Sequence, residues 1–391
     1  MTATGAGVGP GPRSAEAAVP QSAADTEAAE PAEGVARQAI DAYTVFNDPA
    51  GGVSDPAIET ELVELIDGAP EGSAIGGAMF SWTRSAVAEA LARAQERGVE
   101  VELAIDRDGG GSNSAPDNNP MRILREANLT RLVFCANPDL GNTACIANRD
   151  YSINHNKFFT FSETGDRTDV VVVSSSNLTT AQTENWNNAT VVHGDAGLHD
   201  FFRNHLDNML EQRRDNNYAD SPDGFYQSDA SNVRVYFPPR ADSNGGTEPE
   251  AATDVVVNRL KYITEAESGC RLDVAHAQFT GPRKPVADEL IRIADLGCEV
   301  RVVGGPTEYI QDQLAGNDNI TVRPLDQMHS KYIVFHGNYN GGADRTLLWT
   351  GSHNLTGPSL RNHDESMIRV ERPEITSAYQ DNFETIWEYA A

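Results

Sequence analysis

A short motif with a histidine and a lysine occurs twice in this chain, in matching surroundings. The first copy is H-N-K at His155–Lys157, and an S-S-N follows at Ser175–Asn177. The second copy is H-S-K at His329–Lys331, and an S-H-N follows at Ser352–Asn354. Only four of the 391 residues are lysines, so the double occurrence is not expected by chance. A chain with this pattern is expected to fold as two related halves that build one shared site.

The similarity between the halves continues upstream of the motifs at a constant spacing. An offset of 199 residues relates Phe80, Val87, Leu91, Gly98 and Val101 to Phe279, Val286, Leu290, Gly297 and Val300. Residues 87–98 and 286–297 have the apolar spacing of a helix that ends at glycine, and strands are predicted at 99–106 and 298–304. Each half therefore contains a helix followed by a strand at the equivalent place.

Shorter segments match in the same way. Strands that end at proline are predicted at 43–49 and 233–239, and amphipathic helices follow at 57–67 and 251–265. Between each H-x-K and its S-x-N we expect a hairpin: strands at 157–161 and 170–174 around a turn at 163–169, and strands at 332–335 and 346–350 around a turn at 336–344. Because side chains alternate along a strand, the histidine and lysine of each motif should share one face.

Together these patterns predict an α/β fold of two pseudo-twofold-related lobes, each a mixed β-sheet flanked by helices. The N-terminal lobe is predicted at 39–225 and the C-terminal lobe at 226–391, joined by the polar linker 213–224. Residues 1–38, rich in Ala, Pro and Glu, are predicted to be a disordered leader.

The first half carries about 25 extra residues before its motif, because the offset between the motifs is only 174. These residues fall within 107–150. A long loop close to a site often shapes the rim of that site, but the segment could equally be inert surface.

The charge of the chain bears on its partners. A formal net charge of −28 repels polyanions at long range, so nucleic acid is not the expected partner. No apolar run reaches the length of about 18 residues that a membrane-spanning helix needs.

The four cysteines form two locally spaced pairs, Cys135 with Cys145 and Cys270 with Cys298. Two disulfides and an oxidising compartment are expected from this spacing. The alternative is four unrelated buried thiols. The expected location is therefore extracellular, although the first 38 residues lack the basic and apolar regions of a signal peptide.

The motif residues suit phosphoryl transfer. Lys157 and Lys331 can supply positive charge to a phosphate, while Asn177 and Asn354 can supply neutral hydrogen-bond donors. One imidazole can attack phosphorus to give a phosphohistidine, and a second can protonate the leaving oxygen. This chemistry requires no metal and no cofactor.

The duplicated motif resembles that of the phospholipase D superfamily, which reads H-x-K-x-x-x-x-D followed by G-S-x-N. The second copy is the closer match because Gly351 precedes its serine, whereas the first copy has Ser174 there. Both copies lack the aspartate, which is replaced by Ser162 and His336. In the family this aspartate is held to support the site and not to attack the substrate.

The resemblance also implies roles for single residues. His155, in the first motif, would be the nucleophile and His329 the acid and base, with the reverse assignment left open. Ser175 and Ser352 would orient the histidines. Glu365 would fix the tautomer of one of them, and Glu184 is the corresponding candidate in the first half.

The resemblance implies a metal-independent phosphodiesterase, a monomer that cleaves or transfers the phosphatidyl group of phospholipids and touches a membrane surface transiently. Two alternatives stay open: a nuclease of the same superfamily, and a catalytically silent binding protein. Ser162 and His336 in place of the aspartates motivate the second alternative.

Overall fold

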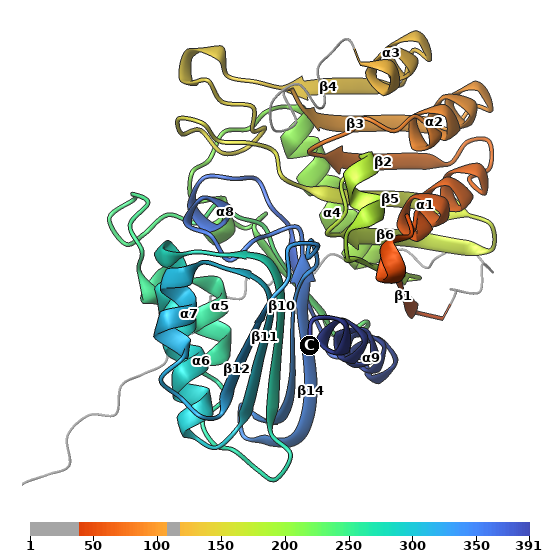
Figure 1. Cartoon of the computed structure of the whole chain (residues 1–391). Coiled ribbons are helices and arrows are strands. Elements are labelled where there is room, and N and C mark those ends of the chain that lie inside the picture. Colours follow the sequence, from red (N-terminus) through yellow and green to blue (C-terminus); the bar gives the residue numbers. More distant parts are fainter. Residues whose placement is uncertain (1–38, 108–117) are drawn as a thin grey trace, which may run out of the picture. The chain divides into compact units, whose positions relative to one another are not determined.

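The computed structural model describes residues 39–107 and 118–391, and both of its sheets lie in one unit, Gln38–Ala391 (Figure 1). The predicted leader at 1–38 and residues 108–117 of the predicted rim lie outside the described residues.

The first sheet has seven strands in the order β1-β7-β6-β5-β2-β3-β4. Its strands are β1 (Asp41–Asn47), β2 (Ala74–Met79), β3 (Glu100–Asp106), β4 (Arg131–Cys135), β5 (Lys157–Thr164), β6 (Arg167–Ser174) and β7 (Asn187–His193). The pairs β2–β3 and β3–β4 are parallel and the other pairs antiparallel. Three helices, α1 (Ala57–Asp67), α2 (Ala86–Glu96) and α3 (Asn119–Glu126), pack on one face, and α4 (Ala196–Leu210) packs on the other.

The second sheet has eight strands in the order β12-β11-β10-β13-β14-β15-β9-β8. Its strands are β8 (Phe225–Ser228), β9 (Val233–Tyr236), β10 (Arg271–Phe279), β11 (Glu299–Pro306), β12 (Ile320–Pro324), β13 (Lys331–Tyr339), β14 (Gly342–Gly351) and β15 (Met367–Val370). Its helices are α5 (Val255–Leu260), α6 (Lys284–Asp295), α7 (Glu308–Leu314), α8 (Gly357–Arg361) and α9 (Pro373–Tyr389). Side chains of α5, α6 and α7 are buried on one face and those of α9 on the other.

The two sheets repeat the same topology. Read from β1, the strand order of the first sheet corresponds strand for strand to β9-β15-β14-β13-β10-β11-β12 in the second. The strand β8 is an addition at the edge of the second sheet. The predicted fold class is confirmed, and each sheet with its helices is called a lobe below. The boundary at 225/226 stays a prediction; β8 begins at Phe225.

Most predicted elements are present. The helix expected at 57–67 is α1, and those expected at 87–98 and 286–297 are α2 and α6. The second hairpin is longer than expected, because Asn340 and Gly341 form its tight turn with φ of 52° and 75°. Two left-handed residues give a turn whose twist matches that of the flanking strands.

The helix predicted at 251–265 is wrong in its extent. The α-helix occupies only Val255–Leu260. Its start is set by Asp254, whose carboxylate accepts hydrogen bonds from the backbone N–H groups of Val256 and Val257. A side chain in this position caps a helix and fixes its first turn.

Two short backbone bridges join the lobes beside the H-x-K motifs. Asn154 pairs with Asp364, and Met328 pairs with Trp186. The N–H of His155 donates to the carbonyl oxygen of Asp364 at 2.9 Å, and the N–H of His329 donates to that of Trp186 at 2.9 Å. Each motif histidine is therefore tied by its backbone to the opposite lobe.

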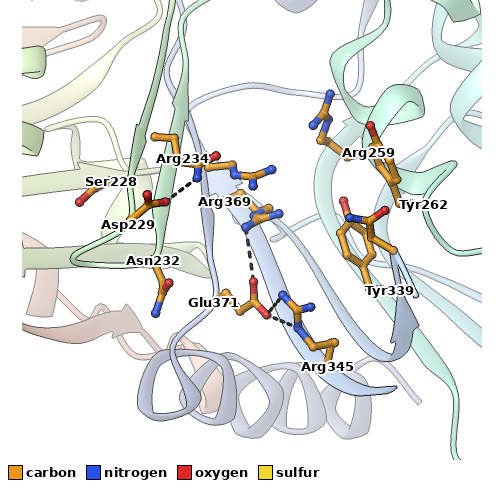
Figure 2. Close-up of a pocket in the computed structure, with 12 residues that line it drawn as sticks. Ser228, Asp229, Asn232, Arg234, Arg259, Tyr262, Tyr339, Arg345, Arg369 and Glu371 are labelled. Carbon is orange, nitrogen blue, oxygen red and sulfur yellow. Dashed lines mark hydrogen bonds and ion pairs between the residues drawn. The ribbon is translucent and has the colours of Figure 1, made fainter. Parts of the chain in front are cut away.

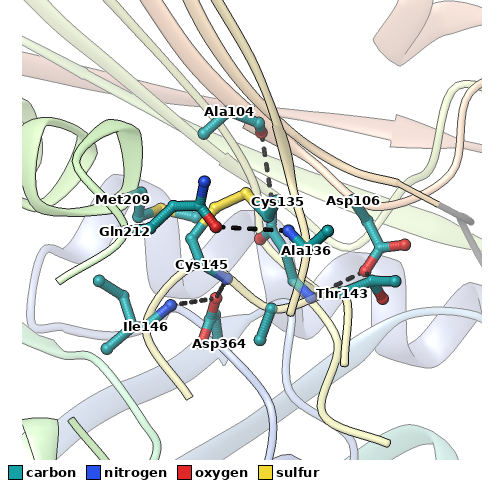
Figure 3. Close-up of a disulfide and its surroundings, with 12 residues drawn as sticks. Ala104, Asp106, Cys135, Ala136, Thr143, Cys145, Ile146, Met209, Gln212 and Asp364 are labelled. Carbon is teal, nitrogen blue, oxygen red and sulfur yellow. Dashed lines mark hydrogen bonds between the residues drawn. A yellow bond between two sulfur atoms is a disulfide. The ribbon is translucent and has the colours of Figure 1, made fainter. Parts of the chain in front are cut away.

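The carboxylate of Asp364 strengthens the first of these bridges (Figure 3). It accepts hydrogen bonds from the backbone N–H groups of Cys145, Ile146 and Ala147 at 2.6, 3.0 and 2.7 Å. The same segment is tied to β4 by the disulfide Cys135–Cys145. The second predicted disulfide, Cys270–Cys298, is also present. Part of the predicted rim thus contacts the second lobe.

We expect Asp364→Ala to lower the free energy of unfolding by on the order of 3 kcal/mol, because three buried N–H donors lose their acceptor. Asp312→Ala, at an exposed position of α7, is the matched control and should change stability little. Urea unfolding followed by circular dichroism measures both. Equal stability of the two variants would show that the Asp364 contacts contribute nothing to the fold.

Candidate active site

His155 is held by a carboxylate from the other lobe. It lies two residues before the start of β5 and is 7% exposed. Its Nδ1 lies 3.0 and 2.9 Å from the two carboxylate oxygens of Glu365, which lies two residues before the start of β15. Because a carboxylate only accepts hydrogen bonds, Nδ1 is the protonated nitrogen. The lone pair of the neutral ring therefore lies on Nε2.

Glu365 is itself fixed in place. It is completely buried, and the hydroxyl of Ser352 donates to its Oε2. The Ser352 oxygen in turn accepts from the backbone N–H of Ser366 at 2.9 Å. The hydroxyl of Ser352 therefore acts on His155 through Glu365.

His329 is held in the same way by the first lobe, but by an amide. Its Nδ1 lies 2.9 Å from Oδ1 of Asn187, which also accepts from the hydroxyl of Ser175 at 2.9 Å. The Asn187 Nδ2 donates to the carbonyl oxygens of Gln182 and Asn185. This fixes the amide orientation, so the Asn187 oxygen must face His329 and Nδ1 again carries the proton.

The expectation for Glu184 is corrected by this geometry. Glu184 is exposed at the end of a 3₁₀ turn, and Asn187 occupies the position that corresponds to Glu365. The sequence did hold a signal: Asn187 comes 12 residues after Ser175, and Glu365 comes 13 residues after Ser352. Asn187 is neutral, so a pattern of acidic residues does not mark it.

Both motif lysines are buried beside their histidines. Lys157 Nζ donates to the carbonyl oxygen of His155 at 2.7 Å, and Lys331 Nζ donates to that of His329 at 2.6 Å. Lys331 Nζ also lies 3.1 and 3.4 Å from the two ring nitrogens of His329. The ring of Phe80, which sequence reasoning did not assign to the site, lies 5.1 Å from Lys157 Nζ and 4.9 Å from the His155 ring.

Burial and the lysine charges shift the protonation of the site. Burial, reinforced by the charges of both lysines, lowers the pKa of His155 and of His329 well below the ordinary value. Burial lowers the pKa of Lys157 to about 7 and also lowers that of Lys331. Both histidines are therefore neutral at pH 7. A bound anion would favour protonation of all four groups.

The two asparagines of the S-x-N motifs have unused hydrogen-bonding capacity. Within the described part of the chain, the buried Oδ1 atoms of Asn177 and Asn354 have no hydrogen-bond partner. Buried polar atoms are normally paired. The two amides are therefore available to a ligand.

The residues that replace the motif aspartates lie away from this cluster. Ser162 and His336 each come five residues after the motif lysine, about 16 Å further along the strand. Ser162 Oγ accepts from the N–H of Ala74, and His336 contacts Thr346 and Asp344 near the hairpin turn. Their identity leaves the contacts of the two motif histidines unchanged.

Three further histidines lie around the site. The rings of His276 and His353 lie edge to face with centroids 5.5 Å apart, and His276 pairs with Lys331 across β10 and β13. His363 Nδ1 lies 3.9 Å from Glu365. Only His353 belongs to a repeated motif, so no sequence pattern pointed to the other two.

In residues 39–107 and 118–391, no group of three or more His, Cys, Asp or Glu side chains is arranged to hold a metal ion. The same residues contain no helix that is long and apolar enough to cross a membrane.

Comparison with known proteins gives the family. The model of the PLD-like domain of cardiolipin synthase matches residues 62–210 and 260–387, more than half of the chain. No curated protein matches the sequence significantly.

Solved structures share the fold. Polyphosphate kinase from Porphyromonas gingivalis is similar with a TM-score of 0.57 and 15% identity, over 88% of this chain and 46% of the kinase chain, so this chain spans less than half of that protein. Phosphatidylserine synthase from Haemophilus influenzae Rd KW20 is similar with a TM-score of 0.55 and 13% identity, over 88% of this chain and 85% of the synthase. The family match extends over both lobes, and from it we conclude that this chain belongs to the phospholipase D superfamily, whose members are phosphodiesterases and transferases.

Proposed function

We propose that this protein is a metal-independent phosphodiesterase that cleaves or transfers the phosphatidyl group of a phospholipid through a phosphohistidine. The observation that carries the proposal is the reciprocal support of the two histidines: Glu365 of the second lobe holds His155, and Asn187 of the first lobe holds His329.

The difference between the two partners supports one assignment of the roles. Attack of His155 Nε2 on phosphorus leaves a positive charge on the ring, and the Glu365 carboxylate stabilises that charge. Asn187 is neutral and gives His329 no such help. His155 is therefore the nucleophile, and His329 is the general acid and base.

The first step breaks the bond from phosphorus to the leaving oxygen. The negative charge of a bound phosphodiester offsets the lysine charges that lower the pKa of His329, so this ring takes up a proton on Nε2. His155 forms the new bond to phosphorus while His329 gives that proton to the leaving group.

The second step frees the enzyme. His329, now neutral, takes a proton from water or an alcohol, whose oxygen attacks phosphorus and displaces His155. Lys157, Lys331, Asn177 and Asn354 would bind the non-bridging oxygens in both steps, and the burial of Lys157, Lys331 and Asn177 strengthens their contacts. The two lysines thus supply the positive charge that faces the phosphate group.

Phospholipid is favoured over nucleic acid by charge and by the family. A net charge of −28 disfavours a polyanion. The family model describes a domain of cardiolipin synthase, and one structural neighbour is named a phosphatidylserine synthase; both names indicate phospholipid chemistry.

The substrate class is tested by parallel incubation, in EDTA, with bis(p-nitrophenyl) phosphate, with phosphatidylcholine plus ethanol, and with single-stranded DNA. We expect p-nitrophenol release and phosphatidylethanol formation, because an alcohol can replace water in the second step. Turnover of DNA alone would indicate a nuclease. No turnover of any substrate would contradict the enzymatic proposal and favour a silent binding protein.

The assignment of the histidines predicts which variant traps the covalent intermediate. With bis(p-nitrophenyl) phosphate, whose leaving group needs little protonation, His329→Ala should still form the adduct but hydrolyse it about 10²–10⁴ times more slowly. Intact-protein mass spectrometry should then show the added phosphoryl group. His155→Ala should show no adduct.

His193→Ala, at a histidine of β7 outside the cluster, is the matched control and should behave as wild type. An adduct that accumulates in His155→Ala and is absent from His329→Ala would reverse the two roles.

A further inference from the structure

A polar cavity lies in the second lobe, apart from the catalytic cluster (Figure 2). Its volume is about 430 Å³, and it is bounded by strands β8, β9, β13, β14 and β15, by helix α5 and by residues close to these elements. None of its lining residues belongs to the H-x-K or S-x-N motifs. A cavity of this size accommodates a small molecule.

Four arginines converge on this cavity, against two acidic residues. The arginines are Arg234, Arg259, Arg345 and Arg369, and the acidic residues are Asp229 and Glu371. Two positive charges are thus left without a carboxylate in the lining. This concentration stands out in a chain with 30 basic and 58 acidic residues.

Two of the arginines are direct neighbours. Arg369 of β15 and Arg234 of β9 are paired across the two antiparallel strands, so their side chains lie on one face. Like charges in this position destabilise a sheet. Burial, and next the charge of Arg234, lower the pKa of Arg369. An anion between the two guanidinium groups would remove the repulsion.

Arg369 is also the most buried of the four. It is 6% exposed, and its Nε is buried without a hydrogen-bond partner. Its Nη2 lies 3.4 Å from a carboxylate oxygen of Glu371, and Glu371 also pairs with Arg345. The side chain of Arg369 also forms a hydrogen bond with Tyr339. Glu371 is thus shared by two cations and cannot satisfy Arg369 alone.

The remaining arginines leave further donors open. Within residues 39–107 and 118–391, neither Arg234 nor Arg259 forms an ion pair, and the Nε of each is buried without a partner. Arg259 instead lies over the rings of Tyr236 and Tyr262, at 5.8 and 5.4 Å. Asp229 is exposed and accepts a hydrogen bond from Gln227, so its charge offsets that of the arginines only from a distance.

We propose that this cavity is a binding site for a dianionic phosphate group, with Arg369 and Arg234 as its central ligands. Guanidinium groups bind phosphate oxygens through paired hydrogen bonds, and two uncompensated charges match a dianion. The group could belong to a free molecule, such as pyrophosphate, or to a phosphomonoester lipid headgroup, such as phosphatidic acid. The proposal does not depend on the proposed catalytic function.

The site is tested in a background that disables phosphate binding at the catalytic cluster, Lys157→Met/Lys331→Met. Isothermal titration calorimetry with pyrophosphate should show one binding event per chain that weakens with added salt. Adding Arg369→Met should weaken binding at least about tenfold, because a charge-assisted contact is lost. Arg213→Met, at an arginine whose side chain is 63% exposed, should leave binding unchanged.

If Arg369→Met does not fold, Arg234→Met repeats the test at a second arginine of the cavity, which lies on β9. A flotation assay with phosphatidylcholine vesicles, with and without phosphatidic acid, distinguishes the two sources. Binding of phosphatidic acid vesicles alone, lost in the arginine variants, would assign the site to a lipid headgroup. Binding of neither probe, or equal binding by the arginine variants and their background, would overturn the proposal.

Discussion

The site depends on hydrogen bonds that cross between the lobes. Neither histidine is positioned by its own lobe alone: Glu365 fixes His155, and Asn187 fixes His329. The backbone bridges of Asp364 and Trp186 bring these partners into range. The duplicated fold therefore produces one site, because each half supplies what the other half requires.

Burial gives these contacts their effect. Both lysines and both histidines lie where water is scarce, and this lowers the pKa of each. In the empty site these four groups therefore lose their protons more readily than they would in water. An anionic substrate raises their pKa values and favours the protonated forms. Charged ligand and charged site stabilise each other, so binding of a phosphodiester prepares the general acid that the reaction needs.

The sequence predicted the fold well, because the fold depends on local patterns of spacing and periodicity. Repeat spacing and helical periodicity located α1, α2 and α6, and the cysteine spacing located both disulfides. The partner of His329 was missed. Asn187 carries no charge, and only its distance from Ser175 marks it. The arginine cavity could not be predicted, since its residues come from strands that pair only in the folded chain.

The central claim is that partners from the opposite lobes fix the tautomer of both motif histidines. The most direct test is ¹⁵N–¹H NMR of histidine-labelled wild-type protein, with signals assigned through His155→Gln and His329→Gln. The account predicts that both rings carry their proton on Nδ1 and stay neutral at pH 6.5, where a free histidine is half protonated. A proton on Nε2 of His155, or titration of His155 near pH 6.5, would contradict it.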